Sequence, residues 1–172
     1  PTQIADAKKI ILPGVGHYDE GMTRLEDAGF IDALPLVVQK SDVTMLGICL
    51  GMQLLCRTSE EGQRSGLGLV DATVCRLRAF EEHGIKVPHM GWNKVAPTKT
   101  NPLFDDHLNE ARFYFVHSYY VKPDSPEIVI GTTMYGDWFC SAFQQQNVFG
   151  VQFHPEKSHR FGMKLVQRYL EL

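Results

Sequence analysis

One cysteine of this chain stands in a setting suited to nucleophilic chemistry. Cys49 follows an apolar run over residues 44–48, which predicts a strand buried on both faces, and it precedes leucines at helical spacing. Gly47 and Gly51 flank it, so the stretch has the form of a nucleophile elbow with a thiol as nucleophile. We expect the free N–H groups and dipole of the following helix to favour the thiolate. The alternative is a buried cysteine that only fills space.

A candidate base lies near the other end of the chain. His154 ends a strand-like run over residues 148–153, Pro155 stops that strand, and Glu156 follows two residues after the histidine. A histidine can accept the thiol proton while a carboxylate holds its ring in one tautomer. Cysteine, histidine and an orienting acid are the parts of a thiol acyl-transfer site. His117 is a rival base, but a lone histidine within a strand is more often structural.

Composition limits the classes of function. The 172 residues suit a single domain, and the net charge of −3 gives no electrostatic reason to expect nucleic acid or an anionic membrane as partner. No run approaches the length of a membrane span. The cysteines show no C-x-x-C spacing, so we expect no metal site, and we interpret them as reduced thiols of a cytoplasmic protein; they are Cys49, Cys56, Cys75 and Cys140.

The order of the predicted elements indicates an α/β fold. A strand ending at Leu12, two short helices within residues 18–40, the strand before Cys49 and the helix after it predict a mostly parallel central sheet with helices on both faces. The active site of such a sheet lies at the carboxyl ends of its strands. Shorter strands follow, including one over residues 113–121, and an antiparallel hairpin returns over residues 148–154.

Two motifs carry a resemblance to a known family. The motifs Gly47-Ile-Cys-Leu-Gly-Met-Gln53 and Phe153-His-Pro-Glu156 resemble those of the class I, triad-type glutamine amidotransferases, whose fold is flavodoxin-like. Three more stretches resemble the glutaminase subunits of imidazole glycerol phosphate synthase in particular; they begin at Leu12, Pro88 and Val116. The resemblance covers essentially residues 1–172 as one amidotransferase domain. The family fold opens with a strand and a helix that this sequence is expected to lack.

The resemblance implies an activity and its residues. Glutamine is hydrolysed to glutamate and ammonia without a cofactor, and the ammonia passes to a (β/α)8-barrel cyclase subunit in a heterodimer of histidine biosynthesis. Cys49, His154 and Glu156 form the triad of this activity. The other residues that the resemblance implies are the oxyanion-stabilising Val15, Gly16 and Leu50, the glutamine-binding Gln53, Glu61, Ser118 and Tyr119, and the partner-facing Met90, Trp92 and Asn93.

Other interpretations stay open at this point. Another triad amidotransferase, such as that of an anthranilate, GMP or pyridoxal phosphate synthase, would share the elbow and the His-Pro-Glu motif. A stand-alone cysteine hydrolase or peptidase would act on other amides without a partner. A binding subunit that has lost activity would keep only the fold. Met90 and Trp92 are also as well suited to the core as to an interface.

Overall fold

The computed structural model describes residues 4–77, 84–104 and 111–172. Its helices are α1 (Tyr18–Asp27), α2 (Phe30–Val38), α3 (Leu50–Leu54) and α5 (His159–Glu171), with short 3-10 turns at Pro126–Ile128 and Pro155–Lys157. Its strands are β1 (Lys9–Gly14), β2 (Thr44–Cys49), β3 (Thr58–Ser59), β4 (Ala72–Arg76), β5 (His89–Lys94), β6 (Ala96–Pro97), β7 (Arg112–His117), β8 (Tyr119–Pro123), β9 (Val129–Tyr135), β10 (Asp137–Gln145) and β11 (Val148–Val151).

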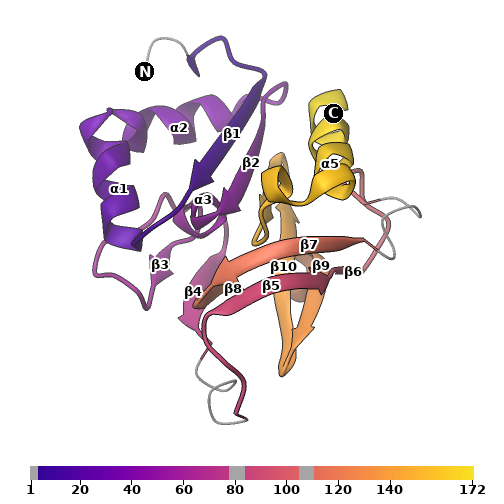
Figure 1. Cartoon of the computed structure of the whole chain (residues 1–172). Coiled ribbons are helices and arrows are strands. Elements are labelled where there is room, and N and C mark those ends of the chain that lie inside the picture. The colour runs from indigo at the N-terminus through magenta and orange to yellow at the C-terminus, as the bar shows by residue number, and fades with distance from the viewer. Residues whose placement is uncertain (1–3, 78–83, 105–110) are drawn as a thin grey trace.

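The α/β architecture is confirmed, and the parallel part of the sheet is the part that carries Cys49. The nine-stranded sheet runs β1-β2-β11-β10-β8-β4-β3, with β9 and β6 continuing from β10 (Figure 1). Strands β1 and β11 flank β2 and run parallel to it, so that Gly14 is the register partner of Cys49. The remaining pairs are antiparallel except β3 with β4.

The prediction of one strand over residues 113–121 is wrong. The chain breaks at Ser118 into β7, which pairs with β5 in a separate two-stranded sheet, and β8, which joins the large sheet. In Figure 1 the β5–β7 pair crosses in front of the large sheet. The aromatic run predicts strand throughout, but β-propensity does not specify which sheet a residue joins.

Helices cover both faces of the large sheet, as expected. Tyr18 and Met22 of α1 pack with Met45 of β2 in one core. On the other face, Leu165 and Tyr169 of α5 pack with aromatic side chains of β7 and β11 in a second core. Within the described residues, no helix has the length and apolar character that crossing a bilayer requires.

Candidate active site

The backbone at Cys49 adopts a conformation that residues other than glycine rarely take. Its φ of 54° and ψ of −113° place it at the sharp turn between β2 and α3. Residues held in such regions cost of order 1–3 kcal/mol and cluster at functional sites. A Cβ on Gly47 would lie 2.7 Å from the backbone of Met52, so the elbow requires glycine there. The predicted nucleophile elbow is therefore present.

The sulfur of Cys49 is held among polar groups although its side chain is 7% exposed. It donates to the carbonyl of Val116 at 3.9 Å, and the side-chain amide of Gln152 donates to it at 3.7 Å. Burial raises the pKa of Cys49 to about 11, although hydrogen bonds from the Leu50 N–H and from Gln152 oppose the rise. The N–H at the start of the helix lowers the pKa, as expected, but burial outweighs it, so the thiol and not the thiolate is favoured in the resting site.

His154 and Glu156 form a hydrogen-bonded pair. The ring Nδ1 of His154 lies 2.7 Å from a carboxylate oxygen of Glu156. The imidazole is 1% exposed, whereas the Glu156 side chain is 55% exposed. A carboxylate only accepts, so in the neutral ring Nδ1 carries the proton and Nε2 presents a lone pair. That Nε2 is buried and has no hydrogen-bond partner. It is therefore free to accept a proton from a neighbouring group.

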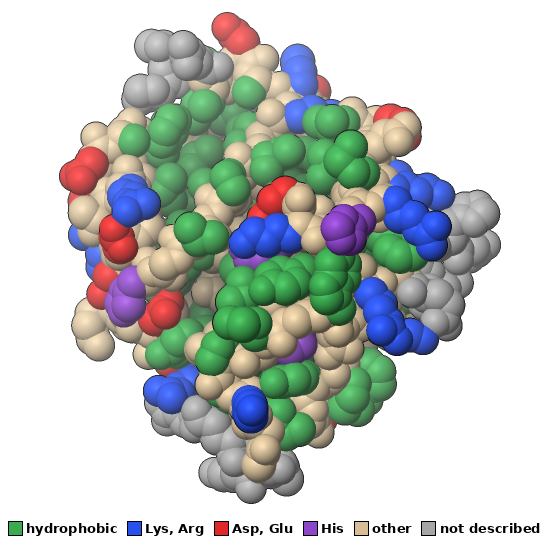
Figure 2. Space-filling model, in the orientation of Figure 1, with side chains coloured by type: hydrophobic (Ala, Val, Ile, Leu, Met, Phe, Trp, Pro, Cys, Tyr) green, Lys and Arg blue, Asp and Glu red, His purple; other side chains and the backbone are tan. Residues whose placement is uncertain are grey.

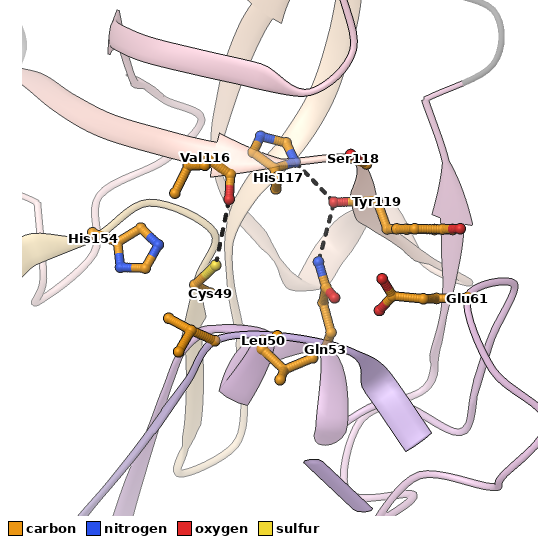
Figure 3. A pocket seen from close by; sticks show the side chains of 11 residues that line it. Cys49, Leu50, Gln53, Glu61, Val116, His117, Ser118, Tyr119 and His154 are labelled. Atoms are coloured by element: carbon orange, nitrogen blue, oxygen red, sulfur yellow. Dashed lines mark hydrogen bonds between the residues drawn. The ribbon is translucent and has the colours of Figure 1, made fainter. Parts of the chain in front are cut away.

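Cys49 and His154 line the same cavity, of about 200 Å³. Figure 3 shows His154 on one side of the thiol and Gln53 and Glu61 on the other. In this structure the S–H of Cys49 donates a hydrogen bond to the Val116 carbonyl and not to His154, so the S–H must turn towards His154 before its proton can be transferred. The cavity is below the size of a drug-binding pocket and suits an amino acid. The full lining is Val15, Gly16, Cys49, Leu50, Gln53, Glu61, Val116, His117, Ser118, Tyr119 and His154.

Comparison with known proteins identifies the family. Residues 2–170 match the model of "Glutamine amidotransferase class-I". The chain belongs to the class I glutamine amidotransferase family. Two relatives carry the name imidazole glycerol phosphate synthase subunit HisH 2: one from Methanococcus maripaludis (47% identical; 99% of this chain, 84% of that protein) and one from Pseudomonas aeruginosa (45%; 98% and 83%). Subunit HisH of Bdellovibrio bacteriovorus is 46% identical over 99% of this chain and 84% of its own length.

Solved structures of amidotransferases share the fold. One described as a glutamine amidotransferase aligns with a TM-score of 0.72 over 95% of this chain and 78% of that chain, at 20% identity. A glutamine amidotransferase from Thermotoga maritima aligns with a TM-score of 0.62 over 95% of this chain and 63% of that one, also at 20% identity. These likenesses support the mixed-sheet α/β architecture.

All residues that the amidotransferase resemblance implied for oxyanion and glutamine binding line the cavity. Val15 is 70% exposed and Gly16 has a φ of 101°, which favours glycine. The Leu50 N–H faces the Cys49 sulfur. One carboxylate oxygen of Glu61 accepts from the Tyr18 N–H at 3.0 Å, which fixes the side chain at the cavity.

His117 lines the cavity but has no nitrogen free for catalysis. Its Nδ1 lies 2.8 Å from the carbonyl oxygen of Tyr119, and its Nε2 lies 3.0 Å from Nδ1 of His89. Because a carbonyl only accepts, Nδ1 of His117 is protonated, and its Nε2 accepts from His89. Burial lowers the pKa of His117 to about 3 and that of His89 to about 4. Both rings are therefore neutral structural groups, as the interpretation of a lone strand histidine expected.

This pair predicts a loss of stability in mild acid. A histidine whose pKa is lower in the folded state binds fewer protons there than it does in the unfolded chain. Its contribution to the free energy of unfolding is therefore complete above pH 6.5 and is lost as the pH falls below that value. Between pH 7.5 and pH 5.5 the free energy of unfolding should fall by about 1 kcal/mol because of His117, and His89 should add to this loss. Urea denaturation of the wild type and of His117→Gln measures it. The variant should show the smaller pH dependence, and the exposed His17→Gln should not.

The residues expected to face a partner lie on β5. Met90 is 62% and Trp92 is 45% exposed, so the alternative that they are core residues is wrong. Asn93 is half-buried, since exposed and less exposed residues alternate along β5. Exposed Met134 and Trp138 border the same hollow as Trp92. Figure 2 shows apolar side chains gathered on this face over β5 and β7.

One site residue has no counterpart in the predictions. Gln152 is fully buried and contacts the Cys49 sulfur, yet it was not among the expected site residues. Its signal in the sequence is a single polar residue within the apolar run that precedes His154. No group of His, Cys, Asp and Glu within the described residues could hold a metal ion.

Proposed function

We propose that this protein is the glutaminase subunit of an imidazole glycerol phosphate synthase. It hydrolyses glutamine to glutamate and ammonia and passes the ammonia to a (β/α)8-barrel cyclase subunit in a cytoplasmic heterodimer. The observation that carries the proposal is that Cys49 and His154, whose Nε2 has no hydrogen-bond partner, line one cavity of amino-acid size. The full-length similarity to proteins named subunit HisH supports the choice of synthase, and the four free thiols fit a reducing compartment.

The first half of the reaction forms a thioester. His154 Nε2 removes the thiol proton of Cys49, and the sulfur attacks the side-chain amide carbon of glutamine. The N–H of Leu50, with an N–H near Val15 and Gly16, stabilises the negative oxygen of the tetrahedral intermediate. The C–N bond then breaks, the imidazolium gives its proton to the leaving nitrogen, and ammonia departs.

The second half releases glutamate. His154 takes a proton from water, the hydroxide attacks the thioester carbon, and the C–S bond breaks. The proton returns to the sulfur, which restores the resting thiol favoured by its raised pKa. Glu156 holds the ring throughout through Nδ1 and stabilises the imidazolium.

Glutamine binds with its amide at Cys49 and its α-amino group at Glu61. The free carboxylate oxygen of Glu61 pairs with the ammonium, and Gln53 lines the cavity between Glu61 and the thiol. Ser118 and Tyr119 contact the carboxylate end of the substrate, at the break between β7 and β8.

Replacing Glu61 by glutamine should weaken substrate binding. The variant loses a charged pair that is made equally in the ground and transition states, so KM for glutamine should rise about 10- to 100-fold with kcat little changed. Steady-state glutamate release measures both constants. Glu60→Gln is the matched control, because Glu60 accepts from the Arg76 N–H and lies outside the cavity lining. A similar KM for both variants would contradict the assignment of Glu61.

The exposed apolar face on β5 is proposed as the partner interface. Met90 and Trp92 supply the large side chains typical of interface hot spots, and Trp92 is held rigid by stacking on His159 at 5.1 Å between ring centroids. Asn93 donates to the Met134 carbonyl at 2.9 Å, which ties β5 to β9 at this face.

The experiment that tests the proposal measures glutamate and cyclised product together. The protein is incubated with glutamine alone, with the barrel cyclase subunit, and with barrel subunits of other synthases. Coupled product with the imidazole-forming cyclase only is the expected result. Coupling to the barrel subunit of another synthase would assign the protein to that synthase instead. Hydrolysis of unrelated amides without a partner would favour a stand-alone hydrolase.

A further inference from the structure

We propose that Gln152 is a positioning residue for the nucleophile: its side-chain amide, oriented by Gln53, holds the Cys49 sulfur and stabilises the thiolate when the proton leaves. This inference rests on the proposed function of the same site. It is carried by a chain of hydrogen bonds from the backbone of β8 to the sulfur. Gln53 donates to the Tyr119 carbonyl at 3.1 Å and to Gln152 Oε1 at 3.0 Å, and Gln152 Nε2 lies 3.7 Å from the sulfur.

The orientation of both amides follows from the backbone end of this chain. The Tyr119 carbonyl can only accept, so the Gln53 atom that faces it is the nitrogen. The same nitrogen faces Gln152, so the Gln152 atom opposite it is the oxygen. The nitrogen of Gln152 therefore faces Cys49 and presents an N–H to the sulfur. A flipped Gln152 would place two donors against each other at one end of its amide and an oxygen against the sulfur at the other.

Burial makes this arrangement specific. The Gln152 side chain is fully buried and that of Gln53 is 4% exposed, so water cannot replace a lost partner. Gln53 uses both of its N–H groups within the protein, which leaves only its oxygen for substrate. An apolar side chain at position 152 would leave a buried N–H of Gln53 without its acceptor and the sulfur without this donor, so the amide links the two ends of the chain of hydrogen bonds.

The role complements that of His154. In the resting site the sulfur donates to the Val116 carbonyl and accepts from Gln152. When the S–H bond turns towards His154 and its proton passes to the ring, the sulfur that accepts from Gln152 becomes a thiolate, so the same N–H then faces a full negative charge. A hydrogen bond to the charged form favours that form, so Gln152 lowers the cost of the thiolate, together with the Leu50 N–H.

The test is the pH profile of Cys49 alkylation by iodoacetamide, followed by peptide mass spectrometry. Gln152→Met keeps the volume but removes both the donor to the sulfur and the acceptor for Gln53, whereas Gln152→Glu keeps the shape and that acceptor and places an oxygen at the sulfur. We expect the apparent pKa of alkylation to rise by about one unit in Gln152→Met, with about a tenfold lower rate below that pKa, and to rise further in Gln152→Glu. The kcat for glutamine should fall while KM changes little.

Thr133→Val is the matched control. It removes another buried hydrogen bond, from Thr133 Oγ1 on β9 to Ser141 Oγ on β10 at 2.8 Å, and neither residue lines the cavity. Its alkylation profile should overlay that of the wild type. A purely structural role of Gln152 would lower stability in both Gln152 variants without moving the profile, and that result overturns the inference. If Gln152→Met does not fold, the isosteric Gln152→Glu decides the question.

The inference and the proposed function can fail separately. Alkylation requires no glutamine turnover, so a profile that shifts in a protein without glutaminase activity would overturn the proposed function alone. Normal turnover with unshifted profiles in both Gln152 variants would overturn the role of Gln152 alone.

Discussion

Cys49→Ala should abolish glutamine hydrolysis and leave the ammonia-dependent reaction of the assembled synthase intact. The variant loses the only atom that can form the thioester, so turnover should fall at least roughly 10³-fold, as in other enzymes that lose a triad member. On the proposed function, the cyclase subunit can take ammonia from solution and does not need the thiol. Glutamate release and cyclised product are measured separately, with glutamine and with an ammonium salt as nitrogen source.

The control for this variant is another cysteine. Cys75 is partly exposed on β4 and lies outside the cavity, so Cys75→Ala should keep the glutamine-dependent reaction. Glutamine turnover at the wild-type level in Cys49→Ala would end the thiol mechanism. Loss of the ammonia-dependent reaction as well would mean that the substitution disrupts the complex and not the chemistry.

Gly51→Ala should damage both the fold and the site. A Cβ at Gly51 would lie 1.8 Å from the Leu12 carbonyl oxygen, which is backbone and cannot rotate away. Strand β1 and helix α3 would have to separate; β1 leads into Val15 and Gly16, and α3 begins at Leu50, directly after Cys49. We expect a loss of at least about 2–3 kcal/mol in unfolding free energy, or roughly 4–12 °C in Tm, together with loss of turnover.

Gly21→Ala is the matched control because it faces the same elbow helix from α1. Its Cβ would meet only methyl groups of Leu54 and Leu50, at 3.0–3.3 Å, and these can move. Alanine is also the better helix former, so the change in stability should be small. Calorimetry of both variants measures the difference. Equal Tm values would contradict the requirement for close backbone approach at the elbow.

The parts of the site that are local in sequence could be predicted. The elbow depends on two glycines within two residues of Cys49, and the His154–Glu156 pair depends on a spacing of two. The strand and helix order around β2 follows from hydrophobic periodicity. These features need no knowledge of distant neighbours, and the structure reproduces them.

The remainder depends on contacts between distant segments. The pKa of Cys49 is raised chiefly by burial that only the assembled fold creates, and this outweighs the lowering by the Leu50 N–H at the helix end. Ser118 divides an aromatic run because β7 and β8 find partners in different sheets. Gln152 reaches the sulfur across 103 residues of sequence, and the exposure of Trp92 depends on what packs over β5. None of these follows from local propensity.

Labelling with a thiol-reactive glutamine analogue tests most directly whether Cys49 and His154 act together. The protein is treated with and without the barrel subunit, and each cysteine is monitored by peptide mass spectrometry. We expect one adduct, on Cys49, and a labelling reaction at least about 100-fold slower in His154→Asn. Three results would contradict this expectation. They are adducts on Cys56, Cys75 or Cys140 at the same rate, no adduct with or without the barrel subunit, and an unchanged rate of Cys49 labelling in His154→Asn.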